Sequence, residues 1–115
     1  MKNVTLQIKR KEFDMIMAGT KKTEWRSPSK YNLNLLFVPD PEFDGKLNGN
    51  PEITSITFLN GRAKDSPQLT IEVIKRIREV KFSRDIDLPD DNFHALEGQF
   101  AIEISLGKIL EIKNC

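Results

Sequence analysis

The sequence predicts a single α+β domain: a small β-barrel of five to six mostly antiparallel strands with one or two helices. Three observations lead to this prediction. Several short segments alternate apolar and polar side chains, one early segment has helical spacing instead, and 115 residues fit one domain better than two. So few short strands cannot form a broad sheet covered on both faces, whereas a barrel buries one face and removes the exposed edges. We therefore treat residues 1–115 as one domain.

The first part of the chain predicts a strand, a helix and a second strand. Residues 3–8 alternate apolar and polar side chains, which is typical of a half-buried strand. Residues 10–18 then carry one apolar stripe at helical spacing, and Gly19 is a natural cap for the end of that helix. Residues 22–26 are expected to be extended.

The middle of the chain predicts a short helix, a loop and two strands. Pro28 favours a helix over residues 29–36, and the prolines and glycines of residues 39–52 indicate a loop. Alternation resumes over residues 53–59. Residues 69–80 are rich in β-branched side chains and predict one long strand, bulged where its apolar parity shifts.

The end of the chain predicts a hairpin. Residues 83–98 are polar and irregular, so no strand is expected there. Residues 100–106 alternate cleanly, and residues 109–112 are again mostly apolar. Gly107 and the lysine after it are suited to a tight turn between these two strands.

Charge is spread unevenly along the chain. Residues 1–30 carry eight lysines or arginines and three acidic residues, a net charge of +5. The remaining residues carry a net charge of −4. The basic end is the natural place for an anionic partner, although solvation alone is the simpler reading of any single lysine.

Cysteine and histidine each occur once, as Cys115 and His94, so neither an intramolecular disulfide nor a zinc cluster can form within the chain. The aspartates of residues 85–91 lie in a predicted loop without ligand spacing, and we expect no metal and no cofactor. No apolar run follows Met1, and none elsewhere is long enough for a membrane helix. We therefore expect a cytoplasmic protein with no membrane partner; its oligomeric state stays open.

A short motif directly follows the predicted helix. Gly19, Lys21, Glu24 and Arg26 stand in the order Gly-x-Lys-x-x-Glu-x-Arg. This motif, placed after a strand and a helix, resembles the signature of the ASCH domain, a family of the PUA-like superfamily, and residues 99–107 look like that family's closing strands. The resemblance implies a small PUA-like barrel with a cleft beside the motif. It also implies binding of RNA or a nucleotide, in some members with hydrolytic activity.

The motif residues differ in what they can contribute. Glu24 and Arg26 share one face of an extended segment, while Trp25 points to the other, towards the core or the helix. Glu24 could accept hydrogen bonds from a base edge or act as a general base, and Arg26 could bind phosphate. Lys21 is a mobile charge suited to phosphate, and Gly19 permits a sharp turn and close approach of a ligand.

Two residues outside the motif complete the predicted ligand-binding set. Tyr31 could stack on a base, and Arg62 could add positive charge at the rim of the cleft.

Three functions remain open at this point. The first is binding of RNA or a nucleotide. The alternative is a metal-independent ribonuclease or nucleoside hydrolase, with Glu24 as the acid or base and Lys21 and Arg26 stabilising anionic charge. In relatives that hydrolyse an acylated cytidine a threonine stands where this chain has Glu24, which counts against that branch. The third is a protein-interaction domain, which nothing beyond size supports.

Overall fold

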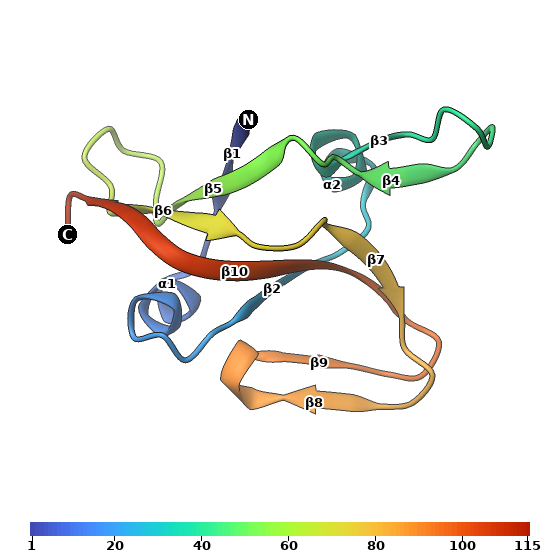
Figure 1. Ribbon diagram of the computed structural model, residues 1–115. Helices are drawn as coiled ribbons and strands as arrows, with labels where there is room; N and C mark the ends of the chain where they lie inside the picture. Colours follow the sequence, from blue (N-terminus) through green and yellow to red (C-terminus); the bar gives the residue numbers. More distant parts are fainter.

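The computed structural model describes all 115 residues and confirms the α+β class (Figure 1). In chain order the elements are β1 (Lys2–Gln7), α1 (Arg10–Met17), β2 (Thr23–Arg26), α2 (Lys30–Leu36), β3 (Phe37–Pro39), β4 (Leu47–Gly49), β5 (Ile53–Leu59), β6 (Gln68–Val73), β7 (Arg78–Lys81), β8 (Ile86–Leu88), the 3-10 turn η1 (Pro89–Asp91), β9 (Phe93–Ala95) and β10 (Phe100–Lys113). Neither helix is long and apolar enough to cross a membrane.

The main sheet is a curled half-barrel in the strand order β1-β5-β6-β10-β2, with β7 also paired to β10. Only β1 and β5 pair in parallel; the other neighbours are antiparallel, as predicted. Figure 1 shows β10 as one long strand across the sheet. Its first half pairs with β2 and β7, and its second half pairs with β6. The outer strands β1 and β2 do not pair with each other, so the barrel is not closed by a backbone ladder.

A core of 17 buried residues fills the concave side of the half-barrel. It forms because alternating apolar residues of β1, β5, β6 and β10 point to the same side, and because α1 places Phe13 and Ile16 over them. A smaller cluster of Phe82, Ala95 and Ala101 lies at the other end, with Trp25 and Phe93 packed against it. Burial of aromatic side chains in both clusters gives the small domain much of its apolar stabilisation.

Two short hairpins lie where the sequence predicted irregular structure. Within residues 39–52, β4 pairs with β3, which ends at Pro39; within residues 83–98, β9 pairs with β8. Each of these strands has only three residues. Alternation cannot be recognised over so few positions, and the surrounding turn residues dominated the prediction.

Two other strand predictions were wrong. The segment 69–80 is two strands, because the chain leaves β6 after Val73 and turns Ile77 into the core before β7 begins. The predicted hairpin at Gly107 does not form: β10 is continuous, and its register against β6 shifts on either side of Ile109. A Cβ atom at Gly107 would lie 2.4 Å from Glu72 Oε1, so this glycine serves a close approach of strands rather than a turn.

The packing of β4 against the segment before β7 gives a test of the fold. A Cβ atom at Gly49 would lie 1.7 Å from the carbonyl oxygen of Ile77. Gly49→Ala should therefore lower the free energy of unfolding by about 3 kcal/mol or more, since no rotamer change relieves a clash with backbone. The control is Gly45→Ala in the same hairpin, where φ is +78° and no atom lies within 4 Å, and which should cost about 1–2 kcal/mol. Equal losses in urea denaturation would contradict the packing.

Candidate functional site

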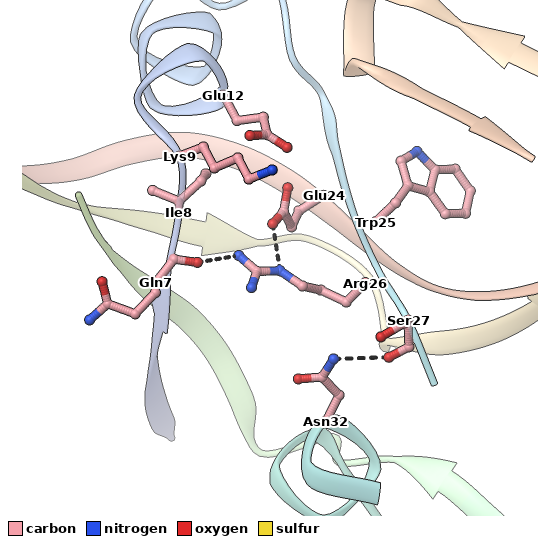
Figure 2. A pocket seen from close by; sticks show the side chains of 9 residues that line it. All are labelled: Gln7, Ile8, Lys9, Glu12, Glu24, Trp25, Arg26, Ser27 and Asn32. Carbon is pink, nitrogen blue, oxygen red and sulfur yellow. Dashed lines mark hydrogen bonds and ion pairs between the residues drawn. The ribbon is translucent and has the colours of Figure 1, made fainter. Parts of the chain in front are cut away.

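An open cleft of about 490 Å³ lies between the outer strands β1 and β2, which do not pair with each other (Figure 2). The end of β1 and the start of α1 form one wall, with Gln7 and Ile8 followed by Lys9 and Glu12. The other side is formed by β2, with Glu24 and Arg26, and by Asn32 of α2. The cleft is therefore the gap left where the half-barrel fails to close.

Glu24 is the buried charge of this cleft. It is 3% exposed, yet its carboxylate has a cation on each side. Lys21 Nζ lies 3.4 Å from Glu24 Oε1, and Arg26 Nε donates a 2.6 Å hydrogen bond to Glu24 Oε2. A carboxylate removed from water needs such partners, because an unpaired buried charge costs several kcal/mol.

Burial raises the pKa of Glu24 above its ordinary value. The positive charges of Arg26 and Lys21 lower it and offset part of that effect, and the nearby Glu12 raises it slightly. A carboxyl group whose pKa is raised within a cleft keeps its proton to a higher pH, which suits it to act as a general acid or base.

Arg26 bridges the two outer strands. Its Nη2 donates a 2.7 Å hydrogen bond to the carbonyl oxygen of Gln7, at the end of β1, as Figure 2 shows. This contact and the hydrogen bond to Glu24 use two of the five N–H groups of the guanidinium. The side chain is 21% exposed, so donors remain for a ligand in the cleft.

Trp25 lies on the opposite face of β2, as strand parity predicted, and Figure 2 shows its ring directed away from the other side chains. The ring stacks on Phe93 at 4.7 Å between centroids and 14° between planes, and it also contacts Phe82 at 5.5 Å. Its indole Nε1 is buried without a hydrogen-bond partner. Trp25 therefore anchors β2 to the β8–β9 hairpin through its ring.

Lys21 does not project into the cleft, contrary to the prediction. It is 4% exposed, and its Nζ donates to the carbonyl oxygen of Asp91 besides pairing with Glu24. Its own N–H still donates to Met15 O at the end of α1, so Lys21 belongs to the turn between α1 and β2. Lys21 thus contacts Glu24 from this turn and does not line the cleft.

Gly19 also lies outside the cleft. Its φ of +77° and two hydrogen bonds, from Gly19 N–H to Ile16 O and from Thr20 N–H to Met15 O, form a Schellman cap. This geometry accounts fully for the glycine. Gly19 lines neither the cleft nor the groove that adjoins it, so the predicted close approach of a ligand there is not supported.

The two predicted residues outside the motif meet at a second groove of about 580 Å³, lined by Tyr31 and Arg62 among others. Tyr31 is 71% exposed. The groove shares Gln7, Arg26 and Asn32 with the cleft, so the two openings adjoin at Arg26. Of the six predicted ligand-binding residues, the structure gathers Glu24, Arg26, Tyr31 and Arg62 around these two openings.

The sequence pattern did not single out Gln7, Lys9, Glu12 or Asn32, all of which line the cleft. The order of elements could have indicated the residues at the start of α1. When a helix follows a strand closely, its first turn lies beside the end of that strand. Asn32 is held by a hydrogen bond from its Nδ2 to Ser27 O, a local contact that the sequence pattern does not reveal. No three acidic, histidine or cysteine side chains come together as a metal-binding group.

Comparisons with protein-family models, curated proteins and solved structures gave no match for this chain. The resemblance to the ASCH domain therefore stays a prediction from a short motif and the order of elements.

The raised pKa of Glu24 predicts a pH dependence of stability. Between the ordinary pKa of 4.5 and the higher value in the fold, the native state holds a proton that the unfolded chain has released. The contribution of Glu24 is therefore fully present below the ordinary pKa and is lost as the pH rises through the folded value. Urea unfolding of the parent and of Glu24→Gln, from about pH 4 to about pH 8, should show their difference shifting in favour of the variant. A pH-independent difference would contradict this.

Proposed function

We propose that the cleft binds single-stranded RNA or a nucleotide, with a base against Glu24 and Arg26. One observation carries the proposal: a buried carboxylate and an arginine with unused donors lie side by side in an open cleft. A base edge presents donors and acceptors next to each other, and Glu24 and Arg26 can satisfy both.

The adjoining groove favours a strand over an isolated nucleoside. Arg26 lies where the two openings meet, and Tyr31 and Arg62 line the second one. Exposed aromatic rings stack on unpaired bases, and arginines contact phosphate, so a chain of nucleotides can extend from the cleft along this groove. The net charge of +5 over residues 1–30 adds long-range attraction for a polyanion.

The proposal predicts salt-sensitive binding of a short fluorescently labelled single-stranded RNA, measured by anisotropy. Arg26→Ala should weaken binding about tenfold or more, because it removes charge-assisted hydrogen bonds to the ligand. Lys64→Ala removes the same charge from the loop beside Arg62 but lines neither opening, and it should change the affinity less than about twofold. Circular dichroism checks that both variants fold.

Two results would contradict the binding proposal. One is the absence of RNA or nucleotide binding by the folded parent at low salt. The other is an equal loss of affinity in the Arg26 and Lys64 variants, which would mean that only net charge matters.

A second candidate function is metal-independent cleavage of RNA, favoured by the raised pKa of Glu24 beside Arg26. The Glu24 carboxylate would take the proton of a ribose 2′-hydroxyl, and the 2′-oxygen would attack the adjacent phosphorus. The 5′-oxygen would leave and accept a proton, giving a 2′,3′-cyclic phosphate and a free 5′-hydroxyl. Arg26 would stabilise the negative charge that builds up on the phosphate.

This second function predicts RNA turnover in the presence of a chelator. Glu24→Gln should lower the rate about a hundredfold or more, and the parent rate should rise with pH through the raised pKa of Glu24. A substrate with a 2′-deoxyribose at the cleaved position is the control and should stay intact. Equal cleavage by the parent and by Glu24→Gln would exclude Glu24 as the base.

A further inference from the structure

The turn of the β8–β9 hairpin holds the segment that leads into β2. Asp91, in the 3-10 turn η1, accepts two backbone hydrogen bonds at its Oδ1: from the N–H of Lys22 at 3.0 Å and from the N–H of Thr23 at 3.1 Å. Its carbonyl oxygen accepts a third, from Lys21 Nζ. One residue, far along the chain, thus contacts three consecutive residues of the motif.

These contacts continue into the cleft. Lys21 Nζ lies 3.4 Å from Glu24 Oε1, and Glu24 Oε2 accepts the 2.6 Å hydrogen bond from Arg26. Arg26 in turn donates to the carbonyl of Gln7 on the opposite wall. A continuous chain of polar contacts therefore runs from Asp91 in the hairpin through Lys21, Glu24 and Arg26 to the end of β1.

We propose that Asp91 is a positioning residue that sets the geometry and protonation of Glu24 from outside the cleft. Its carboxylate fixes the backbone of Lys22 and Thr23, and this places the Lys21 ammonium behind the Glu24 carboxylate. The effect of Asp91 on Glu24 follows from these contacts alone. An effect of Asp91 on RNA affinity rests in addition on the proposed function.

The hairpin does not need the Asp91 carboxylate to stay docked. Phe93 stacks on Trp25 at 4.7 Å, and Ala95 is buried in the same cluster. At the base of the hairpin Asp85 Oδ1 accepts the N–H of Glu97 at 2.9 Å without touching β2. The Asp85 carboxylate therefore stabilises the hairpin itself, whereas the Asp91 carboxylate holds the backbone of the motif.

The surroundings of Glu24 determine how it should respond. Lys21 faces it from the turn after α1, Arg26 from β2, and Lys9 and Glu12 from the start of α1 across the cleft. On β10 the residue paired with Glu24 is Ile104, which is apolar. When Lys21 is free to withdraw, Glu24 loses one of its two close cations, and its pKa should rise further.

The test is a carbon-13 NMR titration of the Glu24 carboxyl group in Asp91→Asn and Asp91→Ala. Both variants lack the charge of Asp91, but the asparagine keeps an oxygen that can accept the two N–H groups. The pKa of Glu24 should be at least about 0.5 pH unit higher in the alanine variant than in the asparagine variant. Asp85→Ala weakens the same hairpin and should leave the pKa of Glu24 at the parent value.

Equal pKa values of Glu24 in the two Asp91 variants would overturn the positioning role, as would the same shift in Asp85→Ala. Should the alanine variant fail to fold, Asp91→Glu displaces the carboxylate by one methylene and must raise the pKa of Glu24 above that of the parent. RNA affinity, measured on the same samples, should fall several-fold in Asp91→Ala but not in Asp91→Asn or Asp85→Ala. A shifted pKa with no RNA binding by the parent would refute the proposed function and leave the positioning role standing.

Discussion

The buried carboxylate of Glu24 is the constraint on which the rest of the structure depends. A charge that is only 3% exposed has to be paired, and the partners are Lys21 and Arg26 on its two sides. Each partner is tied to a backbone carbonyl elsewhere, Lys21 to Asp91 and Arg26 to Gln7. One buried charge thus links the turn after α1, the β8–β9 hairpin and the two outer strands of the half-barrel.

The open side of the half-barrel follows from the same contacts. Unpaired sheet edges normally attract other strands, and small barrels avoid this by closing. Here β1 and β2 stay apart and are bridged by the Arg26 side chain, which leaves a cleft with polar walls. The gap that interrupts the backbone ladder is therefore also where hydrogen-bond donors and acceptors remain available to a ligand.

Local periodicity predicted the parts of the fold that depend on neighbouring residues. It placed the strand, helix and strand up to Arg26, the Gly19 cap, and Trp25 on the face opposite Glu24. It failed where distant contacts decide. Lys21 turns inward, where Asp91, 70 residues away, accepts its hydrogen bond, and β10 continues through Gly107 because it pairs with β6 on both sides of this residue. The three-residue strands β8 and β9 are held by the contact of Phe93 with Trp25, which no local pattern encodes.

The most direct test of the central claim is an amide NMR titration of the folded protein with a short single-stranded RNA. Binding in the gap between β1 and β2 predicts that the largest shift changes fall on the residues that line it, including Gln7, Ile8, Arg26 and Asn32, and extend to Tyr31. A third opening, lined by Lys46, Arg76 and Arg78 and sharing no lining residue with the other two, should change little. Changes centred on that opening, with the gap unaffected, would contradict the account.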